Sequence, residues 1–482
     1  MNFLSIDVGT TACKCQLFSE SGEILDYIFE EFDFKKIDGY DYIDIVAIKE
    51  CIGKMIREIS SKREISSIAV SSLGEAFVLL DKEDNVVFYP MLYTDPRGDG
   101  EAEALKERFD EEEYFGITGV IPHSMYSLSK LLWLKNNYPD VYDRADKLLL
   151  VCDYIGYILT GERVIDYALA SRSGAFDVSK MEFSSVILDK LGIDKRLFST
   201  PKKAGTLVGR LKEEWGIDAT LVLGSHDQVC TALGAGAIDP GDAVDGLGTV
   251  ECITTIFEGK PDSITMGRQG YPCVPFAKDG LYCTYILNYS CGSTVNWLRK
   301  KIMHGYRECE TDFFTYIERD MKDEPTGILT LPYFGGASTP YQDMDAKGAI
   351  VNLRTDTSDS ELYRSIMEGT AMEMRLNCEQ VLDYGINVKE LVATGGGANS
   401  DKWMQIKADI QNLPIKVLRS SEGGLCGCAM LQSVALGRAK DLSDACDIFV
   451  KYKKSFTPKD HSAYEEQYKK YTKLYKTLKE LF

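Results

Sequence analysis

The chain has 482 residues, of which 44% are hydrophobic and 27% charged, and its formal net charge at pH 7 is −19. This length predicts two domains rather than one packed core, and the composition is that of an ordinary globular protein. The acidic balance argues against nucleic acid and against an anionic membrane as partners, because both require a basic face.

The 14 cysteines are scattered without a CxxC pair, which indicates free thiols in a reducing cytoplasm rather than a metal centre. The first residues lack the basic region of a signal peptide. The longest apolar stretch, residues 148–160, is interrupted by Asp153 and Gly156 and therefore cannot cross a bilayer. We expect a cytoplasmic protein.

The first 80 residues have the pattern of a mixed sheet covered by a helix. Three strand-like runs come first, then a run whose apolar residues recur at helical spacing, then two further strand-like runs. The expected strands are residues 3–8, 14–18, 24–29, 65–71 and 77–80, and the expected helix is residues 46–59. This order favours an α/β fold.

A Gly-Thr turn joins the first two expected strands and places Gly9, Thr10 and Thr11 just after Asp7. Such a turn exposes backbone N–H groups and hydroxyls, which suit a phosphate group. Asp7 either holds Mg²⁺ beside the phosphates or hydrogen-bonds its own turn. Lys14 either adds positive charge to the phosphates or is a solvated strand residue.

Two polar segments that follow the later strands are candidates for a sugar site. Gly74 and Glu75 come directly after one apolar run, and Tyr93 and Asp95 lie in the loop after the next. Acidic groups at these places suit the hydroxyls of a polyol. The alternative for the second segment is a charged β-turn, with Asp95 paired to Arg97 at the surface.

Residues from about 100 to 200 are expected to be mostly helical. A short strand at 221–224 then leads to Asp227 and Gln228, followed by a helix rich in small residues at 229–237. Asp227 is a candidate to accept a proton from a substrate hydroxyl, and the alternative is a helix N-cap. Gln228 is a candidate to orient the substrate.

The turn-rich segment 239–242 is the expected domain boundary. The strand pattern restarts after it and contains a second Gly-Thr turn at Gly248 and Thr249. Two such turns, one in each half of the chain, are suited to grip a polyphosphate from both sides. A long amphipathic helix is expected at 361–382.

A strand at 390–394 runs into a glycine-rich segment, and Ser400 is the expected N-cap of the helix that follows. A strand, glycines and a helix start allow a nucleotide to lie against the backbone. Gly396, Gly397 and Asn399 are therefore candidates for adenosine binding, and the alternative is a sharp strand–helix turn. Residues from about 464 onward are expected to be helical and are assigned no chemistry.

Taken in order, these motifs resemble those of the FGGY carbohydrate kinases, in the superfamily that includes actin, the heat-shock chaperone ATPases and hexokinase. The resemblance extends to about residue 440. The matching segments are residues 7–11, 159–162, Asp166, 170–172, 224–228, 248–249, 331–340 and 394–409. In one of them, Ala337 and Ser338 replace the usual Glu-Arg pair.

The resemblance implies an α/β fold of two actin-like (ribonuclease H-like) domains, each a mixed β-sheet flanked by helices, around a central cleft. Residues 1–241 are the implied N-terminal sugar-binding domain, and residues 242–450 are the implied C-terminal ATP-binding domain. A helical tail is expected at 451–482.

The implied reaction transfers the γ-phosphoryl group of ATP to a primary hydroxyl of a small sugar. In this interpretation Asp227 takes the hydroxyl proton and Asp7 positions Mg²⁺. The implied ATP-binding residues are Thr10, Thr11, Lys14, Gly248, Thr249, Gly396, Gly397 and Asn399. The implied sugar-binding residues are Gly74, Glu75, Tyr93, Asp95, Asp227 and Gln228.

The resemblance leaves the sugar open. Glycerol kinases carry Arg-Glu at the position of Gly74-Glu75, xylulokinases carry Met-His, and many family members have Trp where this chain has Tyr93. The missing Arg and Trp are expected to make room, which favours a ketose or sugar alcohol of four to six carbons. A homodimer is compatible with the resemblance. The alternatives are a non-kinase ATPase, acting as a chaperone or filament, and a sugar-binding sensor without turnover.

Overall fold

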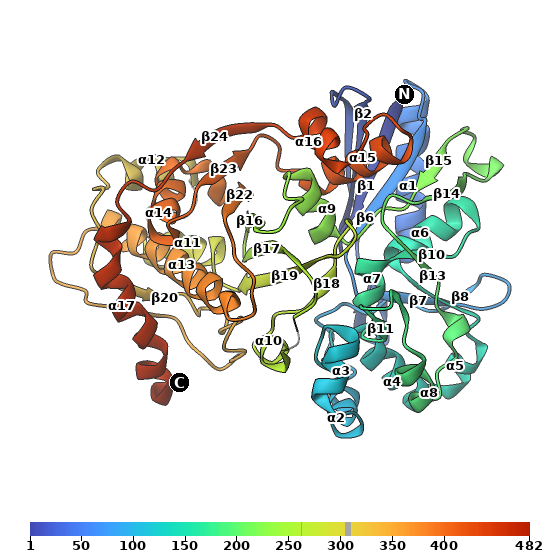
Figure 1. The fold of residues 1–482 in the computed structure, drawn as a ribbon, viewed down its shortest axis with the longest axis horizontal. Coiled ribbons are helices and arrows are strands. Elements are labelled where there is room, and N and C mark those ends of the chain that lie inside the picture. Colours follow the sequence, from blue (N-terminus) through green and yellow to red (C-terminus); the bar gives the residue numbers. More distant parts are fainter. Residues whose placement is uncertain (262, 304–309) are drawn as a thin grey trace.

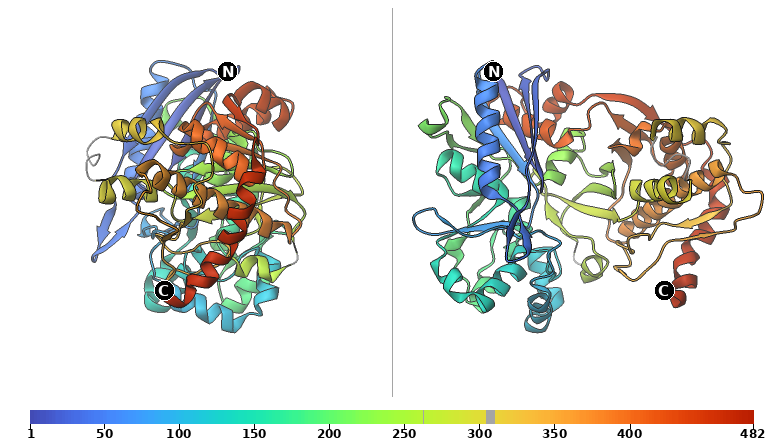
Figure 2. Two further views of the ribbon diagram at one scale, coloured as in Figure 1. Left: turned by 90° about the vertical axis from the view of Figure 1, so that its left-hand side faces the viewer. Right: turned by 180° about the vertical axis from the view of Figure 1, so that it is seen from behind.

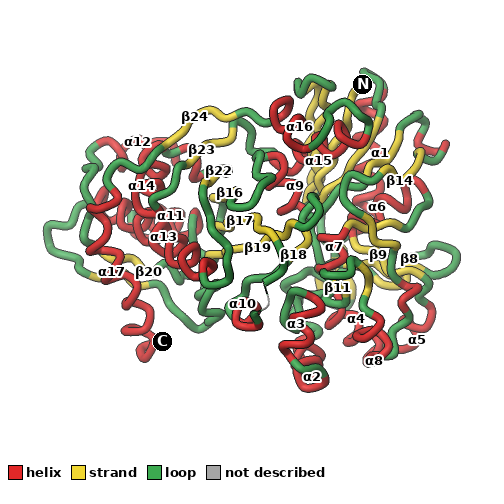
Figure 3. The backbone as a smooth tube through the Cα atoms, viewed as in Figure 1, coloured by secondary structure: helices red, strands yellow, loops and turns green. Residues whose placement is uncertain are grey.

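The computed structural model describes residues 1–261, 263–303 and 310–482, which form two halves side by side (Figure 1). Each half is built on one large sheet with helices around it, and Figure 3 shows the strands inside and the helices outside. No helix within these ranges combines the length and the apolar character that a membrane span requires.

The sheet of the first half has six strands in the order β14-β15-β6-β1-β2-β3. Its strands are β1 (Asn2–Val8), β2 (Ala12–Ser19), β3 (Ile24–Glu31), β6 (Ser67–Ser72), β14 (Leu207–Arg210) and β15 (Thr220–Val222). β1 runs antiparallel to β2 and parallel to β6, and β6 runs parallel to β15. Every residue of β6 is buried, as in a strand covered on both faces.

The sheet of the second half repeats this core arrangement in seven strands, in the order β18-β19-β17-β16-β22-β23-β24. Its strands are β16 (Asp242–Leu247), β17 (Glu251–Glu258), β18 (Val274–Pro275), β19 (Leu281–Asn288), β22 (Glu390–Thr394), β23 (Ile415–Leu418) and β24 (Tyr452–Phe456). β16 runs antiparallel to β17 and parallel to β22, as β1 does to β2 and β6. The two Gly-Thr turns therefore occupy equivalent hairpins.

The helices agree with the apolar spacing of the sequence. α1 (Ile45–Ser60) is capped by Asp44, whose side chain accepts hydrogen bonds from two backbone N–H groups. One stripe of α1 is apolar and buried. Figure 2 shows this helix beside the strands of the first sheet. The remaining helices of the first half are α2 (Asp99–Arg108), α3 (Glu111–Thr118), α4 (Ser127–Asn137), α5 (Pro139–Arg144), α6 (Val151–Thr160), α7 (Tyr167–Ser171), α8 (Ser185–Leu191) and α9 (Asp227–Gly234).

Short strands accompany these helices, with β7, β8 and β9 forming a separate three-stranded sheet. The short strands of the first half are β4 (Lys35–Ile37), β5 (Tyr40–Tyr42), β7 (Phe77–Leu80), β8 (Val86–Phe88), β9 (Lys147–Leu150), β10 (Val164–Asp166), β11 (Phe176–Asp177), β12 (Glu182–Phe183) and β13 (Thr200–Lys202). The second half has one further hairpin of β20 (Leu329–Leu331) and β21 (Ala349–Val351).

The helices named in the second part of the chain are α10 (Ile264–Arg268), α11 (Gly292–Trp297), α12 (Glu310–Arg319), α13 (Asp359–Leu382), α14 (Asp401–Gln411), α15 (Gly423–Ala435), α16 (Leu442–Phe449) and α17 (His461–Leu478). Ser400 caps α14 as expected, because its hydroxyl accepts a hydrogen bond from the Trp403 N–H. The C-terminal residues are helical over α17, but β24 precedes that helix and was not expected.

α15 and α16 follow β23 of the second sheet in the sequence but pack against the first half. α15 packs on β1, β6 and α9 (Figure 1). The ring of Phe449, at the end of α16, lies against Phe3 and Phe18 of the first sheet. The α9–α15 contact is so close that a Cβ atom on Gly234 would lie 1.9 Å from the carbonyl oxygen of Gly423. The chain then returns through β24 to the second sheet.

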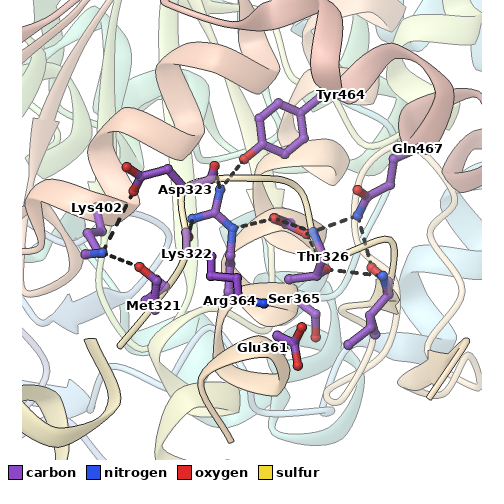
Figure 4. Close-up of polar contacts among 12 residues, drawn as sticks. Met321, Lys322, Asp323, Thr326, Glu361, Arg364, Ser365, Lys402, Tyr464 and Gln467 are labelled. Carbon is purple, nitrogen blue, oxygen red and sulfur yellow. Dashed lines mark hydrogen bonds and ion pairs between the residues drawn. The ribbon is translucent and has the colours of Figure 1, made fainter. Parts of the chain in front are cut away.

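A buried polar network fixes α17 to α13 (Figure 4). Arg364 of α13 donates hydrogen bonds to Glu368, to the Tyr464 hydroxyl and to the carbonyl oxygens of Lys322 and Asp323, at 2.7–2.8 Å. These contacts satisfy the guanidinium inside the protein, and α17 lies on the side of the second half that faces away from the first.

Candidate active site

Asp7 lies near the end of β1, beside the first Gly-Thr turn. Its Oδ1 accepts a hydrogen bond from the Ser71 hydroxyl at 2.5 Å, and its Oδ2 is 3.8 Å from Lys14 Nζ. Ser71 and Lys14 are its neighbours on β6 and β2. Burial raises the pKa of Asp7, and Ser71 and Lys14 offset part of this effect.

Lys14 links the first turn to the start of α15. Its ammonium donates a hydrogen bond to Glu422 Oε2 at 2.9 Å. Burial acts against the charged amine, but the hydrogen bond and charge of Glu422 outweigh burial and raise the pKa of Lys14. Lys14 is thus neither a freely solvated strand residue nor an unpaired cation in this structure.

Asp227 is the first residue of α9. Its Oδ1 accepts a hydrogen bond from the Gln228 N–H at 2.6 Å and lies 3.2 Å from His226 Nε2. Burial, with the charges of Asp7 and Glu75, raises the pKa of Asp227 to about 7. A carboxylate with a pKa near the working pH is well matched to proton transfer.

Asp7 and Asp227 face one region of the molecule. A Cβ atom on Gly424 would lie 3.7 Å from Asp7 Oδ1 and 3.7 Å from the hydroxyl of Thr231, one turn after Asp227 on α9. The end of β1 and the first turn of α9 therefore adjoin the same glycine. On the other side of Asp227, the Gln228 Oε1 accepts a hydrogen bond from Thr254 of β17 at 3.2 Å.

Glu75 forms a buried ion pair with Arg172. Arg172 Nε donates a hydrogen bond to Glu75 Oε1 at 2.6 Å, and the guanidinium lies over the rings of Tyr126 and Tyr285 at 5.0 and 5.6 Å. Among the residues that the structure describes, Arg172 Nη1 has no hydrogen-bond partner.

The absence of Arg before Glu75 does not open free space at Gly74, contrary to the sequence-based expectation. A Cβ atom on Gly74 would lie 3.1 Å from Arg172 Cγ and 3.2 Å from the His226 ring. Two side chains from elsewhere in the chain therefore lie close to the position that a Cβ atom of residue 74 would take.

Asp95 is paired with Arg97, but the pair is not at the surface. The two side chains are joined by hydrogen bonds of 2.5–3.1 Å and are only 8% and 10% exposed. Burial acts against the charged carboxylate, but the hydrogen bonds from Arg97 outweigh it and lower the pKa of Asp95. Tyr93 is 47% exposed.

The two Gly-Thr turns are both hairpin turns with internal hydrogen bonds. The Gly9 N–H donates to the Ala12 carbonyl at 2.9 Å, and the Gly248 N–H donates to the Val250 carbonyl at 3.0 Å. In the second turn, N–H groups at the start of α11 also donate to the carbonyls of Gly248 and Thr249. The hydroxyl-bearing Thr11 and Thr249 are both exposed.

A cavity of about 750 Å³ lies in the second half, in the size range of small-molecule sites. Its walls include Gly248, Thr249, Gly396, Gly397, Asn399 and Trp403. The predicted second turn and the glycine-rich segment thus share one cavity. Gly395 shapes this junction, because its φ is +90° and a Cβ atom would lie 2.6 Å from the Leu247 carbonyl oxygen.

Residues 2–234 match the N-terminal domain of the FGGY family of carbohydrate kinases, and residues 248–436 match its C-terminal domain. The chain belongs to this family. The resemblance and the expected pair of actin-like α/β domains are thereby confirmed, and the protein is a sugar kinase, a phosphotransferase of a family that uses ATP. The family match sets aside the chaperone or filament ATPase.

Three FGGY relatives cover nearly the whole chain. The xylulose kinase of Staphylococcus xylosus is 26% identical over 491 residues, covering 98% of this chain and 99% of the relative. The gluconokinase of Bacillus subtilis (strain 168) is 26% identical over 492 residues, covering 96% and 93%. A ligand-bound xylulose kinase from Lactobacillus acidophilus has a similar crystal structure, with a TM-score of 0.90, 25% identity and coverage of 99% and 98%.

Three side chains of this candidate site were not expected from the sequence. Arg172 was part of a matching motif but carried no assigned role, and its pairing with Glu75 needs contacts across 97 residues. Tyr285 of β19 and Glu422 before α15 belong to the second part of the chain and have no local signal. Only the packing of the two halves brings Tyr285 and Glu422 close to the residues of the first half.

Proposed function

We propose that this FGGY kinase transfers the γ-phosphoryl group of ATP to a primary hydroxyl of a small, uncharged ketose or sugar alcohol. The observation that carries the proposal is Asp227 at the start of α9, with a pKa raised to about 7 and within electrostatic reach of Asp7. Asp227 accepts the proton of the sugar hydroxyl. The hydroxyl oxygen bonds to the γ-phosphorus as the bond to ADP breaks.

The nucleotide is proposed to bind with adenosine in the cavity of the second half, against Gly396, Gly397 and Asn399. Its phosphates would then extend toward Gly248 and Thr249 and reach the first turn across the cleft. Lys14 would contribute positive charge near that turn while held by Glu422.

Asp7 is proposed to position Mg²⁺. The described residues contain no cluster of three or more His, Cys, Asp or Glu side chains able to hold a metal ion. A single carboxylate beside a hydroxyl suits Mg²⁺, which keeps several waters and takes other ligands from the substrate phosphates. The ion would neutralise charge on the transferring phosphoryl group.

The sugar is proposed to lie between Asp227, Gln228 and the Glu75–Arg172 pair, with Tyr93 and Asp95 nearby in the first half. The relatives carry the names of a neutral ketose kinase and of a gluconate kinase. Because Glu75 already neutralises Arg172, the remaining charges of Asp7 and Asp227 favour an uncharged sugar over a sugar acid.

A coupled ADP-release screen tests this proposal. The panel contains xylulose and other ketopentoses, tetritols, deoxyhexuloses, glycerol and gluconate. We expect a neutral ketose or sugar alcohol to give the highest kcat/KM and a phosphate ester detectable by mass spectrometry. Release of ADP that no sugar accelerates would contradict the kinase proposal, and a clear preference for gluconate would contradict the uncharged substrate.

A further inference from the structure

His226 lies between the proposed base and a hydroxyl from the other half of the protein. Its Nε2 is 3.2 Å from Asp227 Oδ1, and its Nδ1 is 3.0 Å from the hydroxyl of Tyr285 on β19. The imidazole is buried, and burial together with the charge of Arg172 lowers the pKa of His226 well below its usual value. His226 is therefore a neutral ring with one N–H donor.

The carboxylate of Asp227 selects the tautomer. An ionised Oδ1 at 3.2 Å electrostatically favours the hydrogen on Nε2, and Nδ1 then accepts from the Tyr285 hydroxyl. In the opposite tautomer, two lone pairs would face each other across 3.2 Å. The Tyr285 hydroxyl supports the same tautomer, because it can donate to Nδ1.

The hydrogen bond from the Gln228 N–H and the polar contact with His226 both fall on the same oxygen of Asp227. Oδ1 receives the Gln228 N–H at 2.6 Å and faces His226 Nε2. Oδ2 is left for the substrate. Oδ1 can keep both contacts whether Oδ2 is free or protonated, because a carbonyl oxygen accepts as a carboxylate oxygen does.

We infer that His226 and Tyr285 are positioning residues that clamp Oδ1 of Asp227, so that Oδ2 alone takes the proton of the sugar hydroxyl. The inference rests on the proposed function and adds two residues to it. Because Tyr285 belongs to the second half, the base is oriented only when the two halves are correctly packed.

Gly74 supports the clamp from the opposite side. The His226 ring lies 3.2 Å from the position that the Cβ atom of any other residue at position 74 would take, which is a tight contact. The charged groups that act on Asp227 come from separate elements and are Asp7, Glu75 and Arg172. Tyr285→Phe leaves these three side chains in place and keeps the ring over which the Arg172 guanidinium lies.

Tyr285→Phe is the first test, with Tyr282→Phe as its matched control on the same strand. The Tyr282 hydroxyl donates to the Val178 carbonyl at 3.0 Å and has no contact with the clamp. Tyr285→Phe is expected to lower kcat for the best sugar of the screen about tenfold, because His226 loses the contact that orients it toward the charged Asp227. KM for ATP and the activity of Tyr282→Phe should stay within about twofold of wild type.

The pH profile separates positioning from a structural role. Loss of a donor to the carboxylate favours its protonated form, so the acidic limb of kcat/KM should move to higher pH in Tyr285→Phe and in His226→Ala. His226→Gln retains a donor amide and should lose less activity than His226→Ala. Unchanged kcat and an unchanged acidic limb in Tyr285→Phe would overturn the inference.

A second measurement needs no turnover. Nitrogen chemical shifts of ¹⁵N-histidine-labelled protein report the tautomer, and His226→Gln assigns the signal among the four histidines of the chain. We expect a neutral Nε2–H ring that stays neutral to pH 5, and a larger share of the Nδ1–H tautomer in Tyr285→Phe. An Nδ1–H ring in the wild type would overturn the clamp. This result does not depend on the sugar screen, so it tests the clamp separately from the proposed function.

Discussion

Asp227 illustrates how one side chain is tuned by its surroundings. It is 39% exposed, yet burial of the site and the charges of Asp7 and Glu75 raise its pKa to about 7. As a base it must be ionised, so kcat/KM for the sugar is expected to fall as the pH drops below about 7. The Gln228 N–H and Arg172 act in the opposite direction and keep the carboxylate usable at neutral pH.

Asp227→Asn keeps the shape of the side chain and removes its basicity. Turnover is expected to fall by a factor on the order of 10²–10⁴, with ATP affinity by calorimetry unchanged. Because the folded state raises this pKa, the proton stabilises the fold below the unfolded pKa of about 4, and this contribution is lost as the pH rises through about 7. The melting temperature of the variant relative to wild type should therefore rise between pH 5 and pH 8.

Near-normal turnover of Asp227→Asn would exclude this residue as the base. A melting temperature difference that does not depend on pH would show that the raised pKa is not a property of the folded protein.

Gly74→Ala tests the packing beneath His226. The added methyl group must displace the imidazole or Arg172, which lie 3.1–3.2 Å from its position. A loss of kcat on the order of tenfold is expected, since small shifts of catalytic groups are costly. Gly100→Ala is the control, because position 100 in α2 is open and exposed. Equal activity of both variants would contradict the close packing of His226 against Gly74.

At the scale of elements, a buried lysine holds α14 to the hairpin of β16 and β17. Lys407 Nζ is 2.8 Å from Asp245 Oδ2 and also contacts Glu251, and all three side chains are fully buried. Burial raises the pKa of Glu251 to about 8, so Glu251 is protonated at neutral pH. The two carboxyl groups then share this proton and the ammonium of Lys407. This cluster anchors the hairpin that carries the second Gly-Thr turn.

Lys407→Met leaves Asp245 buried without a counter-charge. A loss of about 3–5 kcal/mol in the free energy of unfolding is expected, measured by urea denaturation. Glu251→Gln is the matched variant, because it replaces a group that is already protonated at neutral pH, and it should cost far less. A similar cost for both variants would contradict the assigned charge state of Glu251.

The elements themselves were predictable where local patterns are strong. Alternation and apolar spacing predicted β1, α1, α13 and β22 within a few residues. β24 was missed because it is a lysine-rich edge strand whose residues are almost all exposed. The buried partners Arg172, Tyr285 and Glu422 were also beyond prediction, because each contact depends on packing between distant segments.

At the scale of the whole molecule, each half is not built from one continuous part of the chain. α15 and α16 follow β23 of the second sheet but cover the first sheet, and Glu422 reaches Lys14 across 408 residues. The groups around Asp7 therefore come from both ends of the chain. The C-terminal family match, residues 248–436, accordingly includes α15, which packs on β1 and β6 of the first sheet.

Because of this interleaving, the gene cannot be cut at the apparent boundary into two self-sufficient products. A fragment ending at residue 241 lacks α15 and α16 and leaves the apolar residues of β1 and β6 without their cover. It is expected to aggregate when expressed alone and to be rescued when residues 242–482 are produced in the same cell, as gel filtration would show. A monodisperse, cooperatively melting fragment would mean that the first sheet needs no contribution from the far end of the polypeptide.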